Sequence, residues 1–248
     1  MANLRIATYN IHKGVQGLGP ARRLEIHNLG HAVEQLDADV VCLQEVRKLH
    51  RREEQYFTRW PELPQAEFLA PEGYEAVYQT NATTRHGEHG NALLSRWPVI
   101  SRGHEDMSDH RFEQRGLLHV TIHAHGRPIH VIVLHLGLIA ASRARQIEQL
   151  GRFVEREIPR KEALVVAGDF NDWGQRLDAL MTQCSLARAR VAGDPAARIN
   201  TFPSRIPLFS MDRIYVRGFR CVSTSVPRGT AWARMSDHLP LVAELELV

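Results

Sequence analysis

The 248-residue sequence predicts an α/β domain in which sheets and helices form separate layers. Short apolar runs recur along the chain, whereas only three segments repeat apolar residues at helical spacing. Some of the runs follow each other closely, as Leu117–His123 and Ile129–His135 do, which is typical of a hairpin. This order contains too many hairpins for a simple alternation of strands and helices. One domain over residues 1–248 is expected, because no linker, repeat or low-complexity tract divides the chain.

Nine apolar runs are predicted as strands because they are short and are bounded by polar or turn-forming residues. In chain order they are Leu4–Ile11, Val40–Gln44, Tyr74–Gln79, Asn91–Ser95, Leu117–His123, Ile129–His135, Ala163–Ala167, Arg213–Val216 and Leu241–Leu247. The run Ala163–Ala167 is almost continuously apolar, which favours a strand covered on both faces.

Helices are predicted where apolar residues recur every three or four positions. Arg22–Leu36 and Ser142–Ile158 both have this spacing, and Leu177–Cys184 is a shorter candidate. The stretch Lys48–Gly73 contains three prolines and is the longest irregular segment expected. Loops of that length inside a compact domain are usually functional or mobile.

The composition is that of an ordinary globular protein. It is 44% hydrophobic and 24% charged with a net charge of +3, which excludes collagen-like, coiled-coil and disordered chains. All but three of the 31 basic residues are arginine, but the net charge is too small to indicate a nuclease. The three cysteines have no C-x-x-C spacing, no apolar run reaches membrane-spanning length, and no secretion leader is expected. A cytoplasmic protein is expected.

Acids, amides and histidines stand where the predicted strands begin or end. These residues are Asn10, Glu45, His135, Asp169, Asn171, Asp212, Asp237 and His238. Rigid strands fix the loops that leave them, so strand ends are where catalytic sites are assembled. Each residue alone has a simpler interpretation: G-D-x-N is usually a turn, a glutamate after a strand is usually solvated, and S-D-H can cap a helix.

The oxygen ligands among these residues favour Mg²⁺ or Mn²⁺ over zinc. Glu45 and Asp237 are hard carboxylate donors. A zinc site is the alternative, since His86-x-x-His89 and His123-x-His125 both occur. The chain has no H-E-x-x-H motif and no cysteine pair to support such a site. His123 and His125 are therefore predicted at the surface, and His86 and His89 on a loop at the substrate entrance.

Eight short motifs, in this order, resemble the endonuclease/exonuclease/phosphatase superfamily, which includes DNase I, exonuclease III, neutral sphingomyelinases and inositol polyphosphate 5-phosphatases. The motifs are Thr8–Gly14, Leu43–Val46, Gly90–Arg96, Arg115-Gly116, His135-Leu136, Gly168–Asn171, Met211–Ile214 and Ser236–His238. The resemblance extends from Leu4 to Leu247. It implies a four-layer αββα sandwich, with two mixed sheets face to face and the site at one end of them.

The resemblance also implies which residues hold the metal and the substrate. Glu45 matches the direct ligand of a divalent cation, and Asn10 and Asp237 match further residues of the metal site. Arg115 resembles an arginine that contacts phosphate, and Asn91 is expected on the substrate side.

Five further residues match the groups that perform the reaction. Asp169 matches the acid that orients or activates the attacking water, and Asn171 its phosphate-contacting companion. His238 matches the catalytic histidine, with Asp212 holding its imidazole. His135 matches the second histidine of DNase I and the sphingomyelinases. Exonuclease III-type abasic-site endonucleases generally lack it, so this residue argues against that branch.

A cluster of basic residues follows Glu45. The segment Arg47–Arg52 is expected to be a solvated loop, with contact to a phosphate backbone or an anionic headgroup as the functional alternative. The aromatic residues Phe57, Trp60 and Phe68 have the same two interpretations, since loop packing explains them as well as stacking or membrane contact does.

These observations predict a Mg²⁺-dependent phosphoester hydrolase, more specifically a phosphodiesterase. Hydrolysis of a phosphodiester needs an in-line water, a cation that absorbs phosphoryl charge, and proton transfer at both ends. Nucleic acid is the first substrate expected, and a phospholipid or a small phosphorylated metabolite the second. A silent binding scaffold is the rival from another class, but it has no need for so complete a catalytic set.

Overall fold

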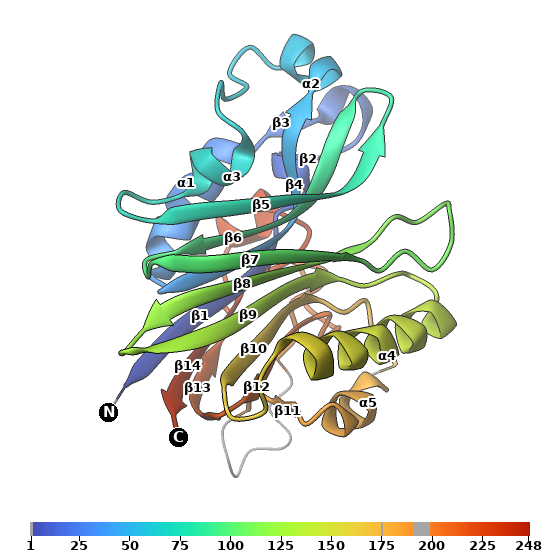
Figure 1. Cartoon of the computed structure of the whole chain (residues 1–248). Helices are drawn as coiled ribbons and strands as arrows, with labels where there is room; N and C mark the ends of the chain where they lie inside the picture. The colour runs from blue at the N-terminus through green and yellow to red at the C-terminus, as the bar shows by residue number, and fades with distance from the viewer. Residues whose placement is uncertain (1, 175, 191–198) are drawn as a thin grey trace.

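The computed structural model describes residues 2–174, 176–190 and 199–248 and contains two large sheets packed face to face (Figure 1). The strands of the first sheet, from edge to edge, are β13 (Phe219–Ser225), β14 (Leu241–Leu247), β1 (Asn3–Asn10), β4 (Val40–His50), β6 (Gly87–Ser95) and β5 (Glu75–Thr84). Those of the second are β11 (Ala187–Arg188), β12 (Asp212–Arg217), β10 (Ala163–Asp169), β9 (Arg127–His135), β8 (Gly116–Ala124) and β7 (Val99–Asp106). Both sheets are mixed, because β1 pairs with β4 and β9 with β10 in parallel, while the other neighbours are antiparallel.

Helices cover the outer face of each sheet. The helices packed on the first sheet are α1 (Ile26–Leu36), α3 (Gln65–Leu69) and α6 (Trp232–Met235). Those packed on the second are α4 (Ala140–Glu157) and α5 (Leu177–Gln183). The short α2 (Arg51–Tyr56) follows β4, and a small ladder joins β2 (Val15–Gln16) to β3 (Arg23–Leu24).

Alternate residues of the central strands fill different layers. In β10, Val165 and Ala167 enter the core between the two sheets, whereas Leu164 and Val166 pack under α4 and α5. All four are fully buried, which explains the continuous apolar run. Together with a third core under α1, this gives the αββα order of layers and confirms the predicted fold class.

The strand directions bring the functional loops to one end of the molecule. The strands β1, β9 and β10 finish there, while β12 and β14 start there, because they run antiparallel to β10 and β1. In the second sheet the register places Asp169 of β10 directly between His135 of β9 and Asp212 of β12.

Some predicted boundaries are wrong. The first helix begins at Ile26 instead of Arg22, because Arg23–Leu24 pairs with Val15–Gln16. The segment from Lys48 to Gly73 is not one irregular loop, since β4 continues to His50 and two short helices follow. The basic cluster Arg47–Arg52 is therefore the end of a strand and the start of a helix, not a loop.

Five strands are not predicted: the two-residue strands β2, β3 and β11, and the longer edge strands β7 and β13. The sequence of β7 is mostly polar, and β7 lies at the edge of its sheet with much of its length exposed. The same holds for β13 at the edge of the other sheet. Edge strands are half solvated and lose the apolar pattern on which the prediction depends. Within the described residues, no helix is long and apolar enough to cross a membrane.

Candidate active site

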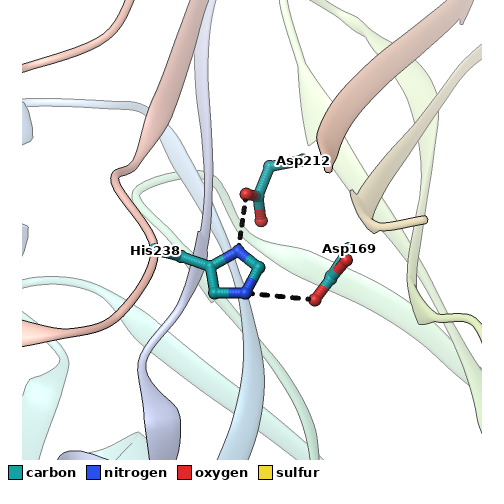
Figure 2. A group of neighbouring side chains, drawn as sticks. All are labelled: Asp169, Asp212 and His238. Carbon is teal, nitrogen blue, oxygen red and sulfur yellow. Dashed lines mark hydrogen bonds and ion pairs between the residues drawn. The ribbon is translucent and has the colours of Figure 1, made fainter. Parts of the chain in front are cut away.

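The predicted residues converge at the end of the sheets where β1, β9 and β10 finish. A hydrogen-bonded pair lies at the centre of the group. The Nδ1 atom of His238 lies 2.8 Å from Oδ2 of Asp212, as Figure 2 shows. Asp212 is fully buried and the ring of His238 is nearly so. Burial alone would lower the pKa of His238, but the carboxylates of Asp212 and Asp169 outweigh it and raise this pKa above the ordinary 6.5. His238 is therefore a cation at neutral pH.

The opposite edge of this imidazole, which carries Nε2, points at Asp169. The Nε2 atom of His238 is 3.6 Å from Oδ2 of Asp169, and Nε2 of His135 is 3.5 Å from the same oxygen. Asn10 donates a hydrogen bond of 3.0 Å to that oxygen as well. The backbone N–H of Asn171 donates to Oδ1 at 2.9 Å. This buried carboxylate thus accepts two hydrogen bonds and is faced by two imidazoles.

Glu45 lies next to Asp169 on the opposite sheet. It has a left-handed backbone with φ 57°, at an irregularity in the pairing of β4 with β6. Its Oε1 is 3.4 Å from Nδ2 of Asn10, and its Oε2 is 2.6 Å from Nζ of Lys13. Burial raises the pKa of the Glu45 carboxyl, but the charge of Lys13, together with His135, outweighs burial and holds the pKa below its usual range. Glu45 is therefore ionised.

The remaining acid, Asp237, lies at the more open side. Its Oδ1 is 3.2 Å from Nδ1 of His12, and its side chain is 39% exposed. Burial would raise the pKa of Asp237, but the hydrogen bond from His12 and the charge of His238 hold it below its usual value. The preceding Ser236 donates a 2.6 Å hydrogen bond to the carbonyl of Asn10, which ties this segment to the end of β1.

His135 differs from His238 in its charge. Burial lowers the pKa of His135 to about 4, and the nearby Arg115 acts in the same direction. The guanidinium of Arg115 is held by the carbonyl of Leu136 at 3.2 Å and by Glu113 at 3.1 Å. The site therefore contains one neutral and one charged imidazole, both facing Asp169.

Two predicted amides hold the backbone in place. Asn171 has a left-handed backbone, with φ 48°, and donates to the carbonyl of Leu136 at 3.0 Å. Asn91 is fully buried and donates to Gly116 and Val133, so its amide group links β6 to the facing sheet. Contact of either residue with a substrate stays a prediction.

The arrangement includes residues to which the sequence analysis assigned no role. Lys13 and His12 pair with two of the acids, and both lie in the run Thr8–Gly14 that carried the resemblance. Phe202 packs on His238, with 4.8 Å between ring centroids. Thr201 accepts a 3.3 Å hydrogen bond from the backbone of Asp212. Phe202 and Thr201 lie in a loop with no recognisable motif, so only the structure identifies them.

The donor set fits a hard divalent cation. One amide, Asn10, reaches both the partly buried Glu45 and the buried Asp169, so two carboxylates converge there. The chemistry is that of oxygen ligands, which magnesium and manganese prefer. A second group consists of Asp169, Asp212 and His238, whose ligand atoms lie within 4.8 Å of one another. Oδ1 of Asp212 is buried without a hydrogen-bond partner among the described residues.

The alternatives weighed from the sequence lie outside this centre or beside it. His89 belongs to β6 and not to a loop, and burial lowers its pKa to about 4, with Lys13 adding to the effect. His123 is exposed at the end of β8, and His125 lies in the turn after it, as expected of surface residues. Arg47 is engaged with the buried Glu53 and is not free to bind a ligand.

Known proteins share both the sequence and the architecture. The pattern of the Endonuclease/Exonuclease/phosphatase family matches residues 7–238. "Uncharacterized protein YbhP" of Escherichia coli K12 is 39% identical over 252 residues, which cover 99% of this chain and 97% of that protein.

Two solved structures show a similar fold at lower identity. D. rerio TDP2 complexed with single strand DNA product covers 98% of this chain and 99% of its own, at 17% identity and a TM-score of 0.67. Mannosyl-6-phosphatase Bt3783 of Bacteroides thetaiotaomicron covers 99% of both chains, at 20% identity and a TM-score of 0.69. With the family pattern matched over almost the whole chain, this protein belongs to the endonuclease/exonuclease/phosphatase family.

Proposed function

We propose that this protein is a metal-dependent phosphodiesterase that hydrolyses its substrate by in-line attack of water. The observation that carries the proposal is the position of Asp169, a buried carboxylate faced by both imidazoles and by Asn10. A carboxylate so fixed can orient a water molecule and accept its proton. Family membership supports hydrolysis of a phosphoester, and the geometry supports these residues as its agents.

The two histidines have different tasks in this proposal. His238 is cationic and is held by Asp212 through Nδ1, so its Nε2–H donates to a phosphoryl oxygen. The charge developing on that oxygen in the transition state strengthens this contact. His135 is neutral and offers a hydrogen bond without adding charge beside Asp169. Asn171 and Arg115 flank the same space and are proposed as further phosphate contacts.

Glu45, Asn10 and Asp237 are proposed to hold Mg²⁺, with Mn²⁺ as a substitute. The cation would stabilise negative charge on the phosphoryl oxygens when bound. Lys13 pairs with Glu45 at 2.6 Å, so a bound cation would share that carboxylate with the ammonium. The resident metal is a proposal based on the donor chemistry.

The substrate class is the open choice within this reaction. Nucleic acid is the first substrate expected from the sequence, and the similarity to TDP2 with its DNA product agrees with it. The similarity to a sugar-phosphate phosphatase agrees with a small phosphate ester. Both similarities are below 25% identity and carry the fold alone. The large apolar side chains exposed in segments next to the site favour phospholipid.

The cytoplasm stays the predicted compartment. All three cysteines are free thiols. Cys42 is fully buried in β4, as expected of a small apolar residue, and a reducing environment suits this arrangement.

A hydrolysis panel tests the proposal. The substrates are plasmid DNA, single-stranded DNA, RNA, a bis-aryl phosphodiester, an aryl phosphomonoester, and vesicles containing phospholipids. Each is incubated with Mg²⁺ or Mn²⁺, with EDTA, and with the Asp169→Asn variant. The matched control is Asp37→Asn, because Asp37 is an exposed carboxylate with a left-handed backbone that asparagine adopts readily.

We expect metal-dependent turnover of at least one diester that is lost in Asp169→Asn and kept in Asp37→Asn. Turnover of the monoester alone would replace the phosphodiesterase by a phosphatase. Equal turnover in EDTA would contradict the metal requirement. No turnover together with no divalent-cation binding would support the silent scaffold.

A further inference from the structure

Large apolar side chains are exposed in segments that follow or precede the strands carrying the site residues. We call six of them the apolar rim: Leu18, Phe112, Leu138, Ile139, Ile206 and Leu208. Their exposed fractions lie between 52% and 88%. Single exposed apolar residues are normal on protein surfaces, but several of them in segments next to one site indicate an interaction surface.

The strand order places these segments toward the end of the sheets where the site lies. Leu18 lies after β1, which ends at Asn10, and the Leu138–Ile139 pair lies after β9, which ends at His135. Phe112 lies in the loop between β7 and β8, and in Figure 1 this loop projects on the same side as the start of α4. The segment with Ile206 and Leu208 leads into β12 and Asp212.

A packed aromatic group connects this rim to the catalytic histidine. The rings of Trp173 and Phe209 lie 4.9 Å apart, and Trp173 and Phe202 5.6 Å apart. Phe202 in turn packs on His238. Phe202 and Phe209 pair with each other, so the hairpin Phe202–Phe209 carries Ile206 and Leu208 between two residues of this aromatic group.

Unpaired arginines accompany the apolar rim. Arg111 and Arg205 precede Phe112 and Ile206 in the sequence, and both are exposed. Two cavities of about 700 and 550 Å³ adjoin the hairpin, and both are lined by Arg205 and Arg234. Arg228 lines the smaller one. None of these four arginines forms an ion pair with a described residue, so their charge is available to an anion.

We infer that the apolar rim and these arginines dock the enzyme on a bilayer that contains anionic phospholipids. Projecting aliphatic side chains with arginines beside them match the boundary between acyl chains and anionic headgroups. Nucleic acid fits the rim less well, because five of its six residues are aliphatic and have no ring to stack on a base. The partly exposed rings of Trp173 and Phe209 nearby are packed against each other. The inference rests on the proposed function for the reaction, and it names a membrane lipid as the substrate that this site meets.

Vesicle flotation tests the docking without requiring turnover. The probe is a vesicle of phosphatidylcholine mixed with phosphatidylglycerol, and the comparison is a vesicle of phosphatidylcholine alone. We expect the full-length protein to float with the anionic vesicles, and Ile206→Ser/Leu208→Ser to partition about tenfold less. Arg205→Glu/Arg234→Glu should lose the preference for anionic vesicles.

The matched control removes two exposed apolar residues from the other end of the sheets. Ile100 lies near the start of β7 and Val248 follows β14, so Ile100→Ser/Val248→Ser should float like the wild type. Asp169→Asn should also float like the wild type, because docking precedes chemistry. Equal melting temperatures of rim variant and control show that both fold.

Several results would overturn the inference. The wild type could fail to float while hydrolysing a soluble diester, in which case the proposed function stands and the docking surface does not. The rim variant and the control could float equally. In a parallel titration with single- and double-stranded DNA, the rim variant could lose affinity for DNA while the wild type ignores vesicles, which would assign the surface to nucleic acid. A further result separates the two proposals. If the wild type and the control float, the rim variant does not, and no ester is hydrolysed, then the docking surface stands and the proposed hydrolase activity is rejected.

Discussion

Four residues of the site adopt a backbone conformation that side chains with a Cβ disfavour. His12, Lys13, Glu45 and Asn171 all have positive φ, and they are the majority of the seven non-glycine residues of this kind in the described parts of the chain. Such conformations cost about 1–2 kcal/mol each and persist where surrounding contacts enforce them. Here they turn Lys13 toward Glu45 and the N–H of Asn171 toward Asp169. Local strain is thus concentrated where side chains must meet across the two sheets.

His238 is the residue whose removal tests the proposed chemistry most directly. His238→Ala removes the imidazole that Asp212 orients, and should lower kcat by a factor on the order of 10²–10⁴, the usual range for a positioned acid–base group. The measurement is kcat on the substrate identified by the panel. The control is His123→Ala, which removes an exposed histidine at the end of β8. Wild-type turnover in His238→Ala would reject the assignment.

Lys13 provides a prediction about the metal. Its ammonium pairs with the carboxylate that is proposed to ligate the cation, so the two positive charges repel each other when both are present. Lys13→Met should therefore lower the Mg²⁺ concentration for half-maximal activity by about tenfold, which corresponds to about 1.4 kcal/mol. Lys48→Met is the control, since Lys48 is exposed on β4. An increased Mg²⁺ requirement would mean that Lys13 supports the ligand instead of competing with the ion.

At the scale of the elements, the site depends on the register of β9, β10 and β12. His135, Asp169 and Asp212 are neighbours because the register pairs Asp169 of β10 with His135 on one side and with Asp212 on the other. Gly168 makes the close approach possible, since a Cβ on it would lie 1.9 Å from the carbonyl oxygen of Leu134. No side chain can occupy that position without moving one strand.

Gly168→Ala should accordingly damage both stability and activity. The added methyl group must push β10 away from β9, at a cost of roughly 3 kcal/mol in the free energy of unfolding. Because His135 and Asp169 stand on those two strands, activity should fall even below the temperature at which the variant unfolds. Urea unfolding and kcat measure the two effects. Gly103→Ala is the control, because a Cβ there meets nothing nearer than 3.7 Å, and it should change neither by much. Equal stability of the two variants would contradict the packing argument.

The elements also show what sequence reasoning can and cannot predict. Strands such as β10 were predictable because apolar residues fill both faces, and the motif residues at their ends were predictable from the resemblance. The polar edge strand β7 was not, since half of its surface is solvated. Neither was the role of Thr201 or Phe202, because their contacts with Asp212 and His238 join segments that no local pattern links. Long-range packing, not local preference, completes the site.

At the scale of the whole molecule, buried histidines occur on both faces of the second sheet, one in the site and one midway along β8. His135 lies in the site, whereas His119 is buried under α4, with its Nε2 2.9 Å from Nδ1 of His130 and its ring against Phe153. Burial lowers the pKa of His119 to about 4, and the neighbouring His130 acts in the same direction. Both cores around the sheet therefore enclose an imidazole that must stay neutral in the folded protein.

These groups predict a loss of stability in weak acid. The unfolded chain binds a proton on each histidine below about pH 6.5, but folded His119 and His135 do so only near pH 4. The unfolded state thus binds more protons between these values, so the free energy of unfolding falls as the pH falls from 6.5 to 4. His238 has the opposite sign: its raised pKa adds stability that is complete below pH 6.5 and is lost as the pH rises above it. This contribution of His238 cannot offset the stability lost in acid, because it does not increase further below pH 6.5.

His119→Gln isolates one of these contributions away from the catalytic site. The amide can still donate to His130, but it does not titrate, so the variant should lose less stability than the wild type between pH 7 and pH 4.5, by about 2 kcal/mol. Urea unfolding at the two pH values measures the difference. His123→Gln on the same strand is the control and should follow the wild type, because His123 is exposed and its ring is solvated in both states. If His119→Gln lost as much stability in acid as the control does, proton uptake at His119 would not be a cause of the acid sensitivity. The carboxylates of the site would then have to account for it, because their lowered pKa values also reduce stability as the pH falls, at lower pH.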